Sequence, residues 1–197
     1  MQQVDTVFRG RVQRRRYDYL AQKDMALSIY YDGPTMDRLG IRDSILFMFN
    51  QLGWENAAIK RRFVTYRELT LEFLSSLVYN PEHGYGLNKG LISFRLFSMD
   101  FTYSRRDLAD LLGFPSGPFV FTTRQEELID DIDLDYFWGS LTGDYHPNPN
   151  EMHSQMIHNP AIRYFHKILA HTLFGKEANN TIVSRDELFI LLCVCLL

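Results

Sequence analysis

Helix-start signals recur along the chain, and each is followed by apolar residues at helical spacing. In a capping box, a Ser or Thr side chain and an acidic side chain three positions later each bind the other's backbone N–H at the start of a helix. The pattern occurs at Thr65–Glu68, Ser104–Asp107 and Ser184–Glu187, and Asn159 before Pro160 adds a cap with a first-turn proline. The sequence therefore predicts a mainly α fold.

Proline and glycine mark two further helices near the N-terminal end. Pro34 suits the first turn of a short helix that Gly40 ends. A second helix, capped by Asp43 or Ser44, is expected to run to Gly53. Its apolar residues cover a wide face, so we expect it to be largely buried.

The period changes from helical to alternating in one stretch. The helix that begins at Thr65 is expected to continue to about Tyr79, where Asn80 and Pro81 end it. Apolar residues then alternate along residues 91–97, and residues 101–103 can return as a second strand. The predicted fold class is a mainly α helical domain with a short β-hairpin, its strands near 91–97 and 101–103.

Two parts of the chain are distinguished by composition. Residues 1–24 hold few large apolar residues and read as a basic arm, either disordered or helical. Residues 25–197 read as one helical domain. The apolar run that begins at Leu188 carries no helix-end signal, so we expect the domain to be incomplete at the C-terminal end, as in a truncated or frameshifted gene product.

Charge and cysteine content limit the classes of function. The formal charge of -3 and the pI near 6.1 give no overall attraction to nucleic acid, so such binding requires a local basic patch. The only cysteines are Cys193 and Cys195, and no apolar leader is present, which favours an intracellular protein of the nucleus or cytoplasm. The longest apolar run is about half of what a membrane-spanning helix needs, so no membrane is expected as a partner.

The local basic patch lies in the N-terminal arm. It consists of five arginines, Arg9, Arg11, Arg14, Arg15 and Arg16. One interpretation is sequence-blind contact with RNA or DNA phosphates, to which the neighbouring tyrosines would add stacking surfaces, or a nuclear import signal. The other is a solvated arm without a ligand.

An acidic segment offers the main candidate for catalysis. It contains six carboxylates, Glu126, Glu127, Asp130, Asp131, Asp133 and Asp135. Such groups could hold divalent metal for nuclease-like phosphoryl chemistry. A two-metal site usually draws its ligands from several separate segments, and no partner set stands out, so we favour a solvated acidic helix and turn.

No other constellation of residues predicts an enzyme. The histidines His153, His158, His166 and His171 lack the spacing of a zinc site, and the cysteines form no C-x-x-C pair. No nucleophile elbow or phosphate-binding glycine loop follows the required order of elements. We therefore expect no catalytic residues, no metal, no cofactor and no small-molecule substrate.

Several passages, in collinear order from about Tyr31 to Leu192, resemble one known family. They are Leu39–Arg42, Leu52–Trp54, Thr65–Leu74, Phe94–Phe97, Leu111–Pro115, Phe137–Trp138, Ile157–His166 and Glu187–Phe189. The chain resembles the C-terminal domain of the first open reading frame protein of Athila-type plant retrotransposons, elements of the gypsy class. The hairpin and the capped helix after it are also similar, more weakly, to the plant mobile domain.

The Athila resemblance implies a gag-like protein of a mobile element that works without catalysis. A gag-like protein would associate with itself and contact element RNA, here through the basic arm because the chain has no zinc-knuckle pattern. Two alternatives stay open. One is a metal-dependent nucleic-acid-processing enzyme that uses residues 126–135, and the other is a decayed element copy without function.

Overall fold

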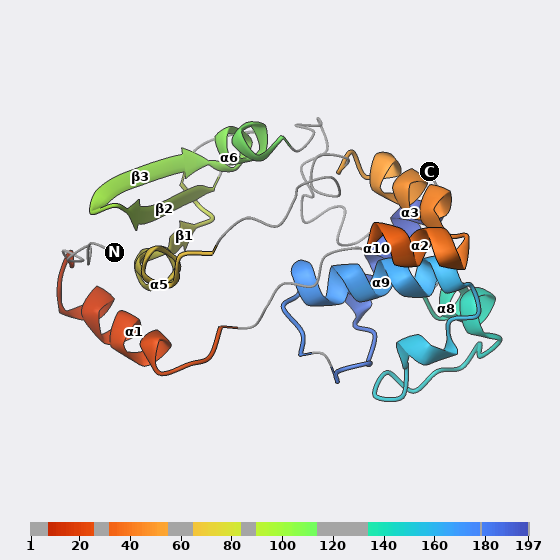
Figure 1. Ribbon diagram of the computed structural model, residues 1–197. Coiled ribbons are helices and arrows are strands. Elements are labelled where there is room, and N and C mark those ends of the chain that lie inside the picture. The colour runs from red at the N-terminus through yellow and green to blue at the C-terminus, as the bar shows by residue number, and fades with distance from the viewer. Residues whose placement is uncertain are drawn as a thin grey trace. The chain divides into compact units, whose positions relative to one another are not determined.

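The chain forms two compact units (Figure 1). Unit 1 consists of Met1–Ala26 and Arg61–Pro118, and unit 2 of Leu27–Lys60 and Phe119–Leu197. A computed structural model describes residues 8–25, 32–54, 65–83, 90–113, 134–177 and 179–196. The division into an arm of residues 1–24 and one domain of residues 25–197 stays a prediction, while the contacts group the N-terminal residues with residues 61–118.

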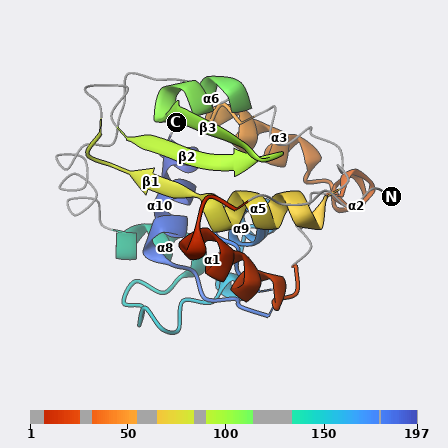
Figure 2. The same ribbon diagram turned by 90° about the vertical axis from the view of Figure 1, so that its left-hand side faces the viewer.

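Unit 1 is a small antiparallel sheet with helices packed beside it. In chain order, its described elements are α1 (Arg11–Ala21), α5 (Arg67–Ser76), β1 (Val78–Asn80), β2 (Leu91–Leu96), β3 (Met99–Ser104) and α6 (Arg105–Leu112). The strands lie in the order β1-β2-β3, as Figure 2 shows. α5 packs against β2, and α1 packs against α5. The predicted hairpin is confirmed, and with it the mainly α fold class.

The start and end of α5 differ from the prediction. Tyr66, not Thr65, is the N-cap, and no side chain caps the helix, so the predicted capping box at Thr65 is wrong. The helix also ends at Ser76, three residues early, because the Ser76 hydroxyl donates to the Glu72 and Phe73 carbonyls and accepts the backbone N–H of a residue in β2. The following residues then pair with β2 as a strand that the sequence reading did not predict.

The turn between β2 and β3 is held by charged side chains from outside it. Phe97 and Ser98 have φ values of 54° and 61°, a left-handed conformation that favours glycine. The Ser98 N–H donates to the buried Glu72 carboxylate at 2.8 Å, and the Arg95 guanidinium donates to the Ser98 carbonyl at 2.5 Å. These two bonds offset the cost of the strained turn, whose Phe97 side chain stays exposed.

The predicted capping box at the start of α6 is confirmed. The Asp107 N–H donates to the Ser104 hydroxyl at 3.1 Å, and the Ser104 N–H donates to the Asp107 carboxylate at 3.0 Å. The hydrogen bonds from Ser104 lower the pKa of Asp107. Gly113 ends the helix with a φ of 73°, as expected for a helix-terminal glycine.

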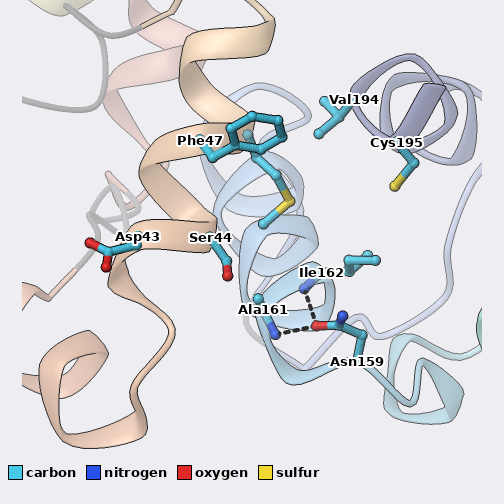
Figure 3. Close-up of a pocket in the computed structure, with 9 residues that line it drawn as sticks. Asp43, Ser44, Phe47, Asn159, Ala161, Ile162, Val194 and Cys195 are labelled. Atoms are coloured by element: carbon cyan, nitrogen blue, oxygen red, sulfur yellow. Dashed lines mark hydrogen bonds between the residues drawn. The ribbon is translucent and has the colours of Figure 1, made fainter. Parts of the chain in front are cut away.

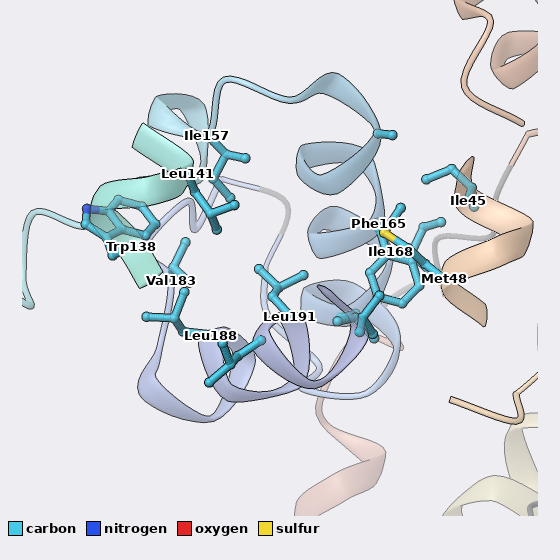
Figure 4. Packing of buried hydrophobic residues seen from close by; sticks show 14 of the residues in the cluster. Ile45, Met48, Trp138, Leu141, Ile157, Phe165, Ile168, Val183, Leu188 and Leu191 are labelled. Atoms are coloured by element: carbon cyan, nitrogen blue, oxygen red, sulfur yellow. The ribbon is translucent and has the colours of Figure 1, made fainter. Parts of the chain in front are cut away.

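Unit 2 is a helical bundle around one apolar core. In chain order, its described elements are α2 (Gly33–Leu39), α3 (Arg42–Gln51), α8 (Leu134–Thr142), the 3-10 helix η2 (Ser154–Met156), α9 (Pro160–Thr172) and α10 (Arg185–Leu196). The core residues in Figure 4 come from α3, α8, α9 and α10 and from the segments between them. Trp138, Phe165 and Leu191 are fully buried, and each such side chain contributes roughly 1.5–3 kcal/mol through its removal from water.

The second predicted helix of unit 2 is real, but its start and its burial differ from the prediction. The Ile41 N–H donates to the Met36 carbonyl of α2, and Ile41 itself is the N-cap of α3. Neither Asp43 nor Ser44 therefore caps α3. One face, with Ile45, packs in the core, whereas Phe47 is 59% exposed. The helix is therefore amphipathic rather than largely buried.

The two C-terminal helices begin where the sequence predicts. The Asn159 side chain accepts the N–H groups of Ala161 and Ile162, with Pro160 in the first turn of α9. At α10 the Glu187 N–H donates to the Ser184 hydroxyl at 3.4 Å, and the Ser184 N–H donates to the Glu187 carboxylate at 2.6 Å. Both predicted caps are confirmed.

Replacing Glu72 tests what holds the hairpin turn. A Glu72→Ala change leaves the Ser98 N–H without its carboxylate acceptor, which costs about 1–3 kcal/mol for a group shielded from water. A Glu72→Gln change keeps an oxygen acceptor and should cost less. Amide hydrogen exchange at Ser98 measures this, and we expect faster exchange in the alanine variant than in the glutamine variant. Equal protection of Ser98 in both variants would contradict this role of Glu72.

Candidate nucleic-acid interface

The predicted phosphate-binding arginines lie on or beside α1. Arg11, Arg14, Arg15 and Arg16 are all exposed, and none forms an ion pair with a carboxylate in the described parts of the chain. At about 100° per residue, Arg11 and Arg15 lie on the side of the helix opposite the buried Gln13, with Arg14 and Arg16 on its flanks. The structure thus brings the arginines onto an outward surface, although not onto a single line.

A line of residues four apart runs along this surface and continues past the helix end. It consists of Arg11, Arg15, Tyr19 and Lys23, which we call the basic ridge. The Lys23 ammonium lies 5.0 Å from the centre of the Tyr19 ring, and that ring is 60% exposed. The sequence reading omitted Lys23, although its spacing of four from Tyr19 is a signal that could have found it.

The helix that carries the ridge is anchored on its opposite side. The Arg67 guanidinium of α5 donates to the Ala21 carbonyl at 2.7 Å and to the Lys23 carbonyl at 3.0 Å. The Arg9 N–H donates to the buried Gln13 side chain at 2.7 Å. These bonds satisfy backbone groups at both helix ends, so the ridge stands on a fixed support.

Two of the predicted residues have partners within unit 1. The Arg9 guanidinium forms an ion pair with Asp100 at 3.0 Å, at the surface of the unit. The Arg14 guanidinium lies 5.8 Å from the centre of the Phe8 ring, which also meets Tyr17 edge to face at 5.1 Å. Tyr19 is therefore better placed than Tyr17 to stack on a ligand.

The acidic and histidine candidates are not brought together in the described structure. Residues 126–133 lie outside it, and Asp135 is an exposed residue of α8. His153 pairs with Thr181 at 2.9 Å, and His158 is exposed. Among the described residues, no three His, Cys, Asp or Glu side chains are grouped so that they could hold a metal ion.

One buried group of charges lies in unit 2. The fully buried Glu187 carboxylate accepts from the Lys176 ammonium at 2.5 Å, and the same oxygen lies 3.6 Å from Nε2 of buried His166. Burial alone raises the pKa of Glu187, but the bonds from His166, Lys176 and Ser184 outweigh it and lower the pKa to about 2. The carboxylate is thus a permanent anion that joins α9, α10 and the segment between them.

A groove of about 470 Å³ lies between α3, α9 and α10 (Figure 3). Its wall includes the exposed Phe47, the Asn159 cap and the thiol-bearing Cys195. Burial raises the pKa of Cys195 and of Cys193, so both thiols are protonated near neutral pH and are poor nucleophiles. The groove does not offer an activated nucleophile at its cysteine.

The fold and the basic ridge define a mainly α protein with a small sheet and an arginine-rich helix on unit 1. None of the described helices is long and apolar enough to cross a membrane. Residues 12–196 match the model of the ATHILA ORF-1 family, so the chain belongs to that family and is a retrotransposon-derived, gag-like protein. This confirms the Athila resemblance, whereas similarity to the plant mobile domain stays a prediction. No curated protein and no solved structure matches the chain.

Acid unfolding tests the buried charges of unit 2. The pKa of Glu187 in the folded chain, about 2, lies below its ordinary value of 4.5, so its contribution to stability is complete above pH 4.5 and is lost as the pH falls toward 2. A Glu187→Gln change should lower the free energy of unfolding at neutral pH by about 3–5 kcal/mol, because it leaves Lys176 and His166 without their anion.

Urea unfolding of the parent and variant chains over this pH range measures the effect. The Glu187→Gln variant should lose less stability on acidification than the parent. The matched control is Glu177→Gln, at an exposed position, which should leave the pH dependence unchanged. Parallel pH profiles for the parent and the Glu187→Gln variant would contradict the assignment.

Proposed function

We propose that the chain is a non-catalytic, gag-like protein that contacts RNA through the basic ridge and associates with itself. The observation that carries the proposal is the alignment of Arg11, Arg15 and Lys23 with an exposed tyrosine on the outward side of an anchored helix. Proteins that bind single-stranded nucleic acid without sequence preference combine cationic side chains with aromatic rings on which bases stack. The ridge supplies both kinds of group.

The local positive charge of the N-terminal residues supports contact with phosphates, although the net charge of the whole chain is negative. Residues 9–24 carry six basic and two acidic side chains. No acidic residue occupies the first turn of α1, so the positive end of the helix dipole adds to the arginine charges there. The ridge therefore presents a positive surface that suits contact with phosphates regardless of nucleotide sequence.

Membership of a structural, gag-like family supports a role without catalysis. The alternative, a metal-dependent nucleic-acid-processing enzyme, depends on the acidic segment 126–135, most of which lies outside the described residues. The expected location in the nucleus or cytoplasm is compatible with contact with element RNA and remains part of the proposal.

Self-association is supported by apolar surface on unit 1. β1 is an edge strand of the sheet, and the side chains of Val78 and Tyr79 are about half exposed, as are those of Phe97 and Met99 at the hairpin turn. Unpaired strand edges and exposed apolar side chains are surfaces that further chains can cover. A second copy of the chain is the occupant that we propose.

Removing the ridge charges tests the RNA contact. Each lost phosphate contact should reduce the slope of log affinity against log salt by about 0.7 for a single strand, so an Arg11→Ala, Arg15→Ala, Lys23→Ala triple variant should lose about 2 from that slope. Alanine is the best helix former, so α1 should persist. Fluorescence anisotropy with single-stranded RNA at several salt concentrations measures the slope.

The matched control replaces an exposed arginine elsewhere in the same unit. Arg106→Ala, on α6, removes one charge outside the ridge and should leave the slope close to that of the parent. A triple variant that binds RNA with the parent's slope would count against the ridge as the contact surface.

A further inference from the structure

A second groove lies along the outward side of α9 in unit 2. It has a volume of about 410 Å³, within the size range of small-molecule sites. Its floor is formed by α9, and its sides include residues of η2, the end of α2 and residues 180–181. It does not share any residue with the basic ridge, and every residue that lines it belongs to unit 2.

Basic side chains gather along this groove. Arg163 and Lys167 are exposed and lie four residues apart on α9, so they project side by side. His171 continues the row; its Nδ1 bonds the Lys176 carbonyl at 2.9 Å, which assigns the proton to Nδ1 because a carbonyl can only accept. None of the residues that line the groove carries a carboxylate. The charge of the lining therefore favours an anionic ligand.

A buried histidine ring forms part of the groove wall. The His166 side chain is only 2% exposed, and its Nε2 lies 3.6 Å from the Glu187 carboxylate. Neither ring nitrogen has a hydrogen-bond partner among the described residues. Buried polar atoms are rarely left unpaired, so a ligand that reaches this ring from the groove would complete its hydrogen bonding.

Part of the wall is apolar and aromatic. Tyr164 lies in the lining with its hydroxyl fixed by the Asp32 N–H at 3.1 Å. The exposed side chain of Leu39 and the ring of Pro160 extend the apolar surface. An aromatic ring held in place is a surface on which a nucleobase stacks.

We infer that this groove binds a nucleoside phosphate. The phosphate lies beside Arg163 and Lys167, and the base lies against Tyr164. A free nucleotide and one unit of a single-stranded RNA present the same chemistry, so either can be the source. The inference does not depend on the basic ridge, because the two surfaces belong to different units and have no residue in common.

Calorimetric titration of the full chain tests the inference with adenosine 5′-monophosphate, inorganic phosphate and adenosine as separate probes. The monophosphate should bind more tightly than either fragment, since it uses both halves of the groove. An Arg163→Gln, Lys167→Gln variant, at two exposed positions where folding is not at risk, should bind it about tenfold or more weakly because two charged contacts are lost. The matched control, Arg106→Gln, lies in unit 1 and should bind as the parent does.

A second readout follows His166 without replacing it. Nitrogen NMR of the histidine rings should show a shift of the His166 resonances on addition of the monophosphate, because this ring forms part of the groove wall. Unchanged His166 resonances would count against the inference. A short single-stranded oligoadenylate then distinguishes the sources in a chain whose ridge is already changed by Arg11→Ala, Arg15→Ala and Lys23→Ala. Loss of the remaining oligoadenylate binding on adding Arg163→Gln and Lys167→Gln assigns the groove to RNA, and unchanged oligoadenylate binding with weakened monophosphate binding assigns it to free nucleotide.

The inference is overturned if the Arg163→Gln, Lys167→Gln change weakens the binding of neither the monophosphate nor the oligoadenylate. It is also overturned if Arg106→Gln weakens binding as much as the groove variant does, since attraction would then be general. If the ridge variant bound RNA as the parent does, the titrations with adenosine 5′-monophosphate would still test the groove. The two proposals therefore fail separately.

Discussion

The buried carboxylate of Glu187 is the contact on which the rest of unit 2 depends. It caps α10 through Ser184, pairs with Lys176 from the segment before it, and lies 3.6 Å from the His166 ring of α9. A buried charge is tolerated only when such partners surround it, so the three elements must come together for the anion to be stable. His166 of this contact also forms part of the wall of the groove along α9.

Capping patterns in the sequence predicted the start of a helix correctly where no backbone group took the place of the side-chain cap. The boxes at Ser104 and Ser184 and the Asn159 cap formed as expected. The box at Thr65 did not form, and α3 begins at Ile41 without the predicted side-chain cap at Asp43 or Ser44, because the Ile41 N–H continues the bonding of the preceding helix by donating to the Met36 carbonyl. Backbone connections between neighbouring elements depend on tertiary packing, which a local pattern of residues does not contain.

The strand β1 and the groove along α9 show a second limit of sequence reading. Val78 and Tyr79 continued an apolar helical period, and only pairing with β2 showed that they form a strand. The sequence pointed to Arg11 and Arg15 of the basic ridge because they belong to one short run of arginines, whereas it did not point to Lys23. The groove could not, because Arg163 and Lys167 read as an ordinary solvated helix face until residues 154–155 and 180–181 enclose them.

The two proposed ligand surfaces differ in kind. The basic ridge is an open line of charge with one exposed ring, which suits a contact that moves along a strand. The groove is a defined volume lined by basic side chains and one tyrosine, which suits one nucleotide unit held in place. A gag-like protein with both could gather RNA through one unit and recognise a nucleotide through the other.

The most direct test of the account is the light-scattering mass of the purified chain across a concentration series, alone and with a generic single-stranded RNA. The account predicts discrete oligomers whose mass grows, or which persist to lower concentration, when RNA is present. A monomer at every concentration, unchanged by RNA, would contradict it and would favour a decayed copy or a protein that acts through other partners.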